Sequence, residues 1–314
     1  QEEINNILLN YKLGKLNKFE GIKEGIENTN YSIQTQKGKY ILTIYERRVK
    51  KTDLPFFSNL MVELSKNGFV CPKPIANKDN NYISDFNDKK FMIVSFLDGK
   101  SKSNLSPSEC KIVGNQIARM HQITKNFKFT RNNDLSVRSW RGIFSQVKDK
   151  CNKIHAELPS LIEANLSSIE KEWPKNLPSG IIHADLFSDN IFFKNNKFSG
   201  FIDFYFSCND FYAFEIAICF NALCFDGVKQ NLSFNVTKAK KLMEGYNEIR
   251  KISKDEKVAI KVLSQGAALR FLLTRVFDYI NTVDNAVVKI KDPEEYLKRL
   301  EFHKNAKSFE DYLI

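Results

Sequence analysis

Three polar side chains within residues 180–210 have the types and spacing that phosphoryl transfer requires. Asp185 is followed after four residues by Asn190, and Asp203 ends an apolar run thirteen residues further on. A carboxylate such as Asp185 can accept the proton of an attacking hydroxyl group. The amide of Asn190 and the carboxylate of Asp203 supply oxygen ligands that suit a hard cation. Together the three residues indicate transfer of a phosphoryl group to a hydroxyl.

The apolar segments around these residues predict how they are positioned. Ile191–Phe193 and 198–204 have the pattern of two strands, and the sequence Lys-Asn-Asn-Lys at 194–197 is typical of a hairpin turn. Such a hairpin would bring Asn190 next to Asp203. Taken singly, an Asp-x-x-x-x-Asn pair also arises by chance, and Asp203 could cap the end of a strand. The combined pattern favours the cation site.

The spacing from Asp185 to Asn190 is that of the kinase catalytic loop, H-R-D-x-x-x-x-N. The segment resembles the equivalent loop of the aminoglycoside phosphotransferase and choline kinase superfamily, and within it the chain is most similar to bacterial homoserine kinases of the ThrB type. The glycine that follows the second kinase aspartate is missing here. The phrases that carry the likeness cover nearly the whole chain: GIENTNY (25–31), KYILTIYERRV (39–49), DLPFF (53–57), IIHADLFSDNIFF (181–193), GFIDFYFSCND (200–210), EIAICFNALCF (215–225), SFNVTKA (233–239), GAALRFLLTR (266–275) and KDPEEYLKRLEFH (291–303).

The resemblance implies an α+β, bilobal, protein-kinase-like fold. A small antiparallel-sheet lobe would span residues 1–94, a hinge 95–100, and a larger, mainly helical lobe 101–314. It also implies ATP-dependent phosphorylation of the hydroxyl of L-homoserine to O-phospho-L-homoserine, a step of threonine biosynthesis. Asp185 would be the base, and Mg²⁺ would be held by Asn190 and Asp203.

Nucleotide contacts are expected in the N-terminal third. The turn that contains Gly25 and ends at Asn30 has no G-x-G-x-x-G, so backbone amides and polar side chains would have to cover the phosphates. The family's asparagine at this place supports Asn30. In this fold the backbone of Ser95, Phe96 and Leu97 would bind adenine. An ordinary hairpin turn and an ordinary strand end would use the same residues.

Kinases pair a lysine of the third strand with a glutamate of the following helix, and neither member of this pair is found here. The alignment places Thr43 where the lysine is expected, and Glu63 lies too late in the next helix to be its partner. The phosphate charge would therefore be met mainly by magnesium, or by a group of nearby basic residues (Lys39, Arg47 and Arg48). The two arginines could equally form a solvated strand end.

A homoserine pocket needs a fixed cation for the carboxylate and acceptors for the ammonium group. Arg270, Arg275 and Asp278 lie on one late helix, at successive steps of five and three residues, and could supply these groups. Arg275 and Asp278 could instead form a routine ion pair. Asn209 is a further substrate candidate, although Asn209-Asp210 has the composition of a turn.

Two other functions remain open. The same fold could phosphorylate choline, methylthioribose or an aminoglycoside, and Trp140, Tyr205 and Tyr279 could form an aromatic box around a quaternary ammonium. An aminoglycoside is a polycation, so an aminoglycoside kinase would be expected to have carboxylates in its substrate pocket. A non-catalytic pseudokinase is the other alternative, and the missing lysine is the argument for it.

Composition excludes several other classes. The chain has 314 residues, 42% of them hydrophobic, and no run of about 20 apolar residues that could cross a membrane. Its net charge of +11 comes from lysines spread along the chain, without the basic tract typical of nucleic-acid binding. Six cysteines without metal-ligand spacing fit a reducing cytoplasm. The sequence does not predict an oligomeric state.

Several local expectations can be compared with the structure. Ser106, Pro107 and Glu109 predict a helix start with serine as the cap. Helices are also predicted over 54–66 and 143–155. Glu215 stands where the family has aspartate, and its longer side chain is expected to satisfy the catalytic-loop backbone.

Overall fold

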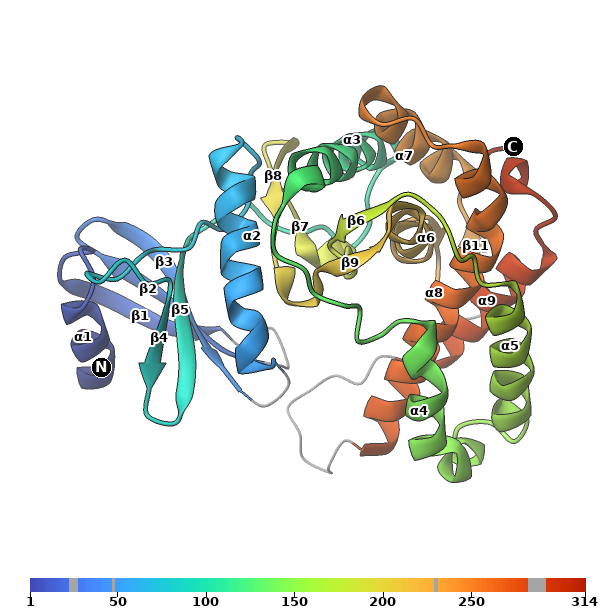
Figure 1. Cartoon of the computed structure of the whole chain (residues 1–314), viewed down its shortest axis with the longest axis horizontal. Helices are drawn as coiled ribbons and strands as arrows, with labels where there is room; N and C mark the ends of the chain where they lie inside the picture. Colours follow the sequence, from blue (N-terminus) through green and yellow to red (C-terminus); the bar gives the residue numbers. More distant parts are fainter. Residues whose placement is uncertain (23–27, 47–48, 229–230, 282–291) are drawn as a thin grey trace. The chain divides into compact units, whose positions relative to one another are not determined.

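The computed structural model describes residues 1–22, 28–46, 49–228, 231–281 and 292–314. These residues form two compact units (Figure 1). The first unit comprises 1–101, 126–131 and 190–205, and the second comprises 102–125, 132–189 and 206–314. The lobe boundaries expected at 94 and 100 stay a prediction. Gly25, Arg47 and Arg48, which the sequence suggested for the phosphates, lie outside the described residues.

The first unit contains a five-stranded antiparallel sheet. Its strand order is β1-β2-β3-β5-β4, and the first three strands follow one another as a meander. The buried faces of β3 and β5 pack Leu42 and Ile93 against Ile4 and Ile7 of α1. The helices and sheet strands of this unit are α1 Glu2–Leu9, β1 Leu16–Ile22, β2 Asn28–Thr35, β3 Gly38–Tyr45, α2 Leu54–Lys66, β4 Ile83–Phe86 and β5 Lys89–Ser95.

A separate hairpin of β7 (Ile191–Lys194) and β8 (Lys197–Phe201) also belongs to the first unit. Its two turn residues, Asn195 and Asn196, have φ of 51° and 59°, and asparagine tolerates this left-handed conformation. The predicted hairpin is therefore confirmed. The return strand ends at Phe201, before the expected 204, because Phe204–Phe206 turns into a 3₁₀ helix.

The second unit is mainly helical. Strands β6 and β9 form a two-stranded antiparallel ladder, and the nearly all-apolar α6 is buried behind them. Its elements are α3 Pro107–Ile123, α4 Val137–Val147, α5 Leu158–Glu172, β6 Ser179–Ile182, β9 Cys208–Phe211, α6 Tyr212–Leu223, β10 Phe225–Asp226, β11 Ser233–Phe234, α7 Val236–Ile249, α8 Lys254–Asn281 and α9 Glu294–Asn305.

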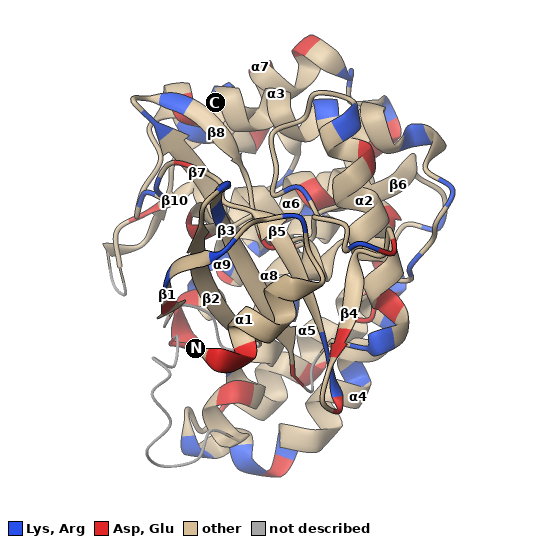
Figure 2. Cartoon of the chain, turned by 90° about the vertical axis from the view of Figure 1, so that its left-hand side faces the viewer, with Lys and Arg blue, Asp and Glu red and all other residues tan. Residues whose placement is uncertain are grey.

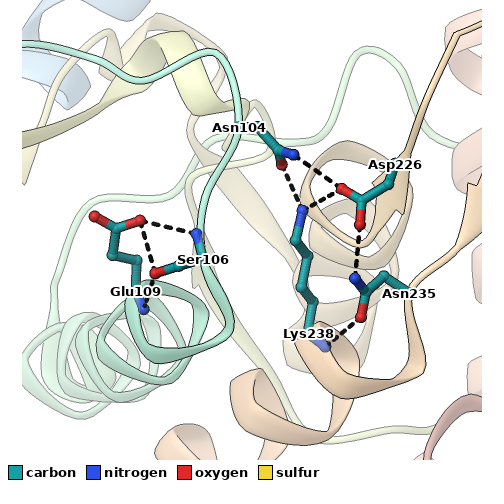
Figure 3. Close-up of polar contacts among 6 residues, drawn as sticks. All are labelled: Asn104, Ser106, Glu109, Asp226, Asn235 and Lys238. Atoms are coloured by element: carbon teal, nitrogen blue, oxygen red, sulfur yellow. Dashed lines mark hydrogen bonds and ion pairs between the residues drawn. The ribbon is translucent and has the colours of Figure 1, made fainter.

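The start of α3 is fixed by the predicted cap (Figure 3). The Ser106 hydroxyl accepts from the Glu109 amide, and the Glu109 carboxylate accepts in return from the Ser106 amide at 2.8 Å. This capping box satisfies two amides that a helix leaves open. The helix start predicted from these residues is confirmed.

A buried lysine binds the segment that precedes α3 at Asn104 (Figure 3). Lys238 of α7 donates to the side chains of Asn104 and Asp226, and Asn235 donates to the same carboxylate at 2.6 Å. Each charge of the pair is thus compensated, as burial requires. Further along the two helices, α3 and α7 meet at Gly114 and Gly245, where an added Cβ would overlap backbone oxygens of the facing helix.

Two local predictions are wrong. The helix expected at 143–155 is α4 at Val137–Val147, followed by a 3₁₀ segment, because Trp140, Phe144 and Val147 form its buried stripe. The turn expected at Asn209-Asp210 is strand β9, since pairing with β6 overrides the composition. By contrast, α2 occupies the predicted residues 54–66.

Charged residues are distributed over both units. Lys and Arg are interspersed with Asp and Glu along the helices and strands (Figure 2). The six cysteines are free and buried. Among the described residues, no helix combines the length and the hydropathy that a membrane span needs.

Candidate active site

The loop that carries Asp185 follows strand β6 in the second unit. Ala184 has φ of 65°, a conformation that is unfavourable for a residue with a Cβ and must be held by its surroundings. Glu215 of α6 accepts hydrogen bonds from the amides of His183 and Ala184. Arg270 of α8 donates from Nη1 to the Ala184 carbonyl oxygen at 2.6 Å. The backbone just before Asp185 is thus held by an acid on one side and a guanidinium on the other.

Glu215 performs the predicted role of satisfying the loop backbone. The residue is fully buried, and this burial raises the pKa of its carboxyl to about 7, against the lowering effect of the two amides and the Arg270 charge. Burial also lowers the pKa of Arg270, while the charges of Asp185 and Glu215 oppose this change. Arg270 stays charged at neutral pH.

The raised pKa of Glu215 predicts a pH-dependent stability. With a folded-state pKa near 7 and an ordinary value of 4.5, the carboxyl contributes stability that is complete below pH 4.5 and is lost as the pH rises through 7. The loss reaches about 3 kcal/mol, which is roughly 5 °C in Tm. The Tm of Glu215→Gln minus that of the wild type should therefore increase between pH 5 and 8.

The exposed Glu163 offers a matched control. Its pKa is lowered by the hydrogen bond from Arg141, so Glu163→Gln should show a constant Tm difference over this pH range. A constant difference for Glu215→Gln as well would show that the carboxyl is ionised throughout.

Asn190 and Asp203 flank the β7–β8 hairpin of the first unit. The Asn190 carbonyl accepts from the Ile202 amide at 3.0 Å, so Asn190 pairs with the residue directly before Asp203. Asn190 is 9% exposed, whereas Asp203 is exposed and has φ of 62°. One amide oxygen and one carboxylate form an oxygen donor set that fits Mg²⁺, an ion that keeps several waters and phosphate oxygens as its other ligands.

The predicted nucleotide residues Asn30 and Thr43 face each other on neighbouring strands. They are register partners of β2 and β3, and the Thr43 hydroxyl donates to the Asn30 side-chain oxygen at 2.7 Å. The register places Asn30 within strand β2, although the sequence suggested a turn. The structure thus brings two of the predicted residues together.

The predicted adenine segment begins at Ser95, the last residue of β5, and continues beyond the strand. The Ser95 amide donates to the Lys73 carbonyl at 2.8 Å, and the Phe96 amide donates to the Lys39 carbonyl at 3.1 Å. The Lys39 ammonium lies 3.7 Å from the centre of the Phe96 ring. Two of the backbone donors expected for adenine are therefore already used by the protein.

The predicted homoserine residues lie in the second unit. Arg270 is 2% exposed and bound to the loop, as described above. Arg275 donates to the Asp292 carbonyl at 2.7 Å and to the Glu295 carboxylate at 3.0 Å. Asn209 pairs with Ile181 in the β6–β9 ladder.

Two of the aromatic residues considered for a quaternary ammonium, Trp140 and Tyr205, are packed against other rings of their own units. Trp140 is fully buried, donates to the Leu135 carbonyl and packs edge-on against Trp173. Tyr205 packs between Tyr45 and Phe57 in the first unit.

Comparison with known proteins gives the same assignment as the motifs. Residues 18–234 match the model of the phosphotransferase enzyme family. The chain is 42% identical over 310 residues to the homoserine kinase of Mesorhizobium japonicum and 44% identical over 310 residues to that of Xanthobacter autotrophicus. Each alignment covers 99% of this chain and 96% of the relative.

Solved structures share the fold at low sequence identity. An amicoumacin kinase superposes with a TM-score of 0.72 at 14% identity, covering 98% of this chain and 94% of that one. A choline kinase from Cryptosporidium parvum superposes with a TM-score of 0.68 at 18% identity, covering 96% and 94%. The expected kinase-like fold class is confirmed. The chain belongs to the phosphotransferase enzyme family and, within it, to the homoserine kinases.

Proposed function

We propose that the chain transfers the γ-phosphoryl group of ATP to the hydroxyl of L-homoserine, forming O-phospho-L-homoserine. The observation that carries the proposal is the match to curated homoserine kinases over 99% of the chain. The product is the phosphate ester expected in threonine biosynthesis. We place the reaction in the cytoplasm, where the six buried thiols would stay reduced.

Asp185 acts as the base in this proposal. It orients the homoserine hydroxyl for in-line attack and accepts its proton. The contacts of Glu215 and Arg270 to the preceding residues support the role, because a base must be held at a fixed position to be effective. No residue of the loop is required to form a covalent intermediate.

Asn190 and Asp203 hold magnesium, and the first unit holds the nucleotide. Mg²⁺ held by these two side chains would supply the positive charge that offsets the negative charge of the phosphates. Asn30 and Thr43 would contact the phosphates as neutral hydrogen-bonding groups. Adenine would use the carbonyl groups of Ser95 and Phe96 together with the backbone of Leu97, since the amides of the first two already donate to protein carbonyls.

Arg270→Lys is expected to lower kcat about 10- to 100-fold while the KM for homoserine changes less than about threefold. Lysine keeps the charge but cannot reproduce the guanidinium contact to Ala184. Steady-state kinetics with varied homoserine would measure both constants. A large rise in KM with unchanged kcat would instead indicate that Arg270 binds the homoserine carboxylate, as the sequence suggested.

Arg275→Lys is the matched comparison on the same helix. Its partners Asp292 and Glu295 lie away from the catalytic loop in the chain, so kcat should be retained. The homoserine-binding roles of Asn209 and Arg275 stay predictions, and for Arg270 the kinetics above decide between that role and the contact to the loop.

A panel of acceptors tests the proposal as a whole. Coupled ADP-release rates would be compared for L-homoserine, choline, methylthioribose and an aminoglycoside. We expect kcat/KM for homoserine to exceed the others by at least about 10³-fold, because a pocket built for a carboxylate and an ammonium leaves these groups unpaired with other alcohols. A higher kcat/KM for another acceptor would reassign the substrate. If MgATP does not raise the Tm of the protein, a pseudokinase would be the better interpretation.

A further inference from the structure

The first unit joins its sheet to α2 by an aromatic triad of Tyr45, Phe57 and Tyr205. The Tyr45 and Tyr205 rings are 5.3 Å apart at an interplanar angle of 81°, and the Phe57 and Tyr205 rings are 5.7 Å apart at 90°. These edge-to-face contacts are favourable beyond the area they bury. The triad connects β3, α2 and the turn after Asp203, which are three elements distant in sequence.

The hydroxyl groups of the two tyrosines are hydrogen-bonded to each other, and β3 carries a second buried hydroxyl at Thr43. The Tyr45 hydroxyl donates to the Tyr205 hydroxyl at 3.0 Å, and the Thr43 hydroxyl donates to Asn30. Burial raises the pKa of Tyr205 to about 12, the Tyr45 and Thr43 side chains lower it, and the Asp203 charge raises it further.

The backbone at Asp203 needs such support. Its φ of 62° is unfavourable for a residue other than glycine and persists only when neighbouring contacts fix it. Tyr205 lies two residues later, in the 3₁₀ turn Phe204–Phe206. Its ring and hydroxyl anchor this turn to β3 and α2.

In protein kinases a lysine of the third strand and a glutamate of the following helix connect these elements by an ion pair. Here Thr43 stands at the lysine position, and Glu63 contacts Asn67 of its own helix end. The aromatic triad joins the same strand and the same helix without any charge.

We propose that Tyr205 is a positioning residue that fixes the backbone presenting Asp203 to magnesium, through its hydrogen bond to Tyr45 and its packing on Phe57. In this way the aromatic triad replaces the missing lysine–glutamate pair as the connection between β3, α2 and the metal-binding segment. The inference rests on the proposed function, in which Asp203 binds the metal.

The test measures metal binding directly. Mn²⁺ would be titrated into the full chain with saturating ADP, and free Mn²⁺ would be followed by electron paramagnetic resonance. Tyr205→Phe keeps the ring and removes the hydroxyl, so the fold is preserved and Mn²⁺ affinity should fall about 3- to 10-fold. Tyr45→Phe should give a similar loss. The double variant should add little, because both changes remove one shared bond.

Two references make the result decisive. Tyr40→Phe removes a hydroxyl from the same strand, where it donates to the Lys37 carbonyl, and should leave Mn²⁺ affinity unchanged. Asp203→Asn should lower it more than any tyrosine variant. If Tyr205→Phe and Tyr45→Phe bind Mn²⁺ as tightly as the wild type while Asp203→Asn binds it more weakly, the inference about the triad is wrong and the metal-ligand assignment of Asp203 stands. An equal loss in Tyr40→Phe would also overturn it, and unchanged affinity in Asp203→Asn would overturn the metal-ligand assignment on which it rests.

Discussion

Asp185→Asn is expected to lower kcat by about 10²- to 10⁴-fold, because the variant keeps the shape of the side chain and removes its ability to accept a proton. Binding of MgATP should change little, since Asp185 faces the acceptor alcohol in the proposed mechanism. ADP release with saturating homoserine measures kcat. The MgATP-induced rise in Tm measures nucleotide binding in the same preparation.

The nearby Asp189 provides the control for this experiment. It is exposed in the 3₁₀ turn Ser188–Asn190 directly before β7, where an aspartate side chain can shape the turn. Asp189→Asn should therefore keep kcat within a few-fold of the wild type. A wild-type kcat in Asp185→Asn would show that Asp185 is not the base.

Asp203→Asn is expected to lower kcat by about 10²- to 10³-fold at ordinary magnesium concentration. The amide can still coordinate a cation through its oxygen, but without the negative charge the metal binds more weakly. Extra Mg²⁺ should therefore recover part of the lost rate. The measurement is kcat as a function of total magnesium at fixed ATP.

The wild type should reach its plateau at a magnesium concentration well below that of the variant. A rate for Asp203→Asn that does not respond to added magnesium would contradict the assignment as a metal ligand. It would leave Asp203 with a role in shaping the backbone, which its φ of 62° also suggests.

Local features of the site were predictable from the sequence. The β7–β8 hairpin follows from two apolar runs around an Asn-Asn turn, and the start of α3 follows from the Ser-Pro-x-Glu pattern of a capping box. The contact of Glu215 to the loop amides was also expected, although on the resemblance to a family. These features depend on residues close in sequence or on a motif with a fixed partner.

Long-range contacts were not predictable in the same way. Tyr45 and Tyr205 are 160 positions apart, and Arg270 is 86 positions from Ala184. Neither pair has a spacing or periodicity that relates its members. The arginines suggested a carboxylate site because their side chains can bind one, whereas in the structure Arg270 binds a carbonyl of the loop. The sequence shows that an arginine can donate hydrogen bonds, but it does not show which group accepts them.

The most direct test follows the transferred phosphate itself. ³¹P NMR of the chain incubated with MgATP and L-homoserine should show ADP and O-phospho-L-homoserine appearing in equal amounts, and neither should form at a comparable rate with Asp185→Asn. ADP formed without the phosphate ester, or the ester formed at the wild-type rate by Asp185→Asn, would contradict the proposed reaction and its base.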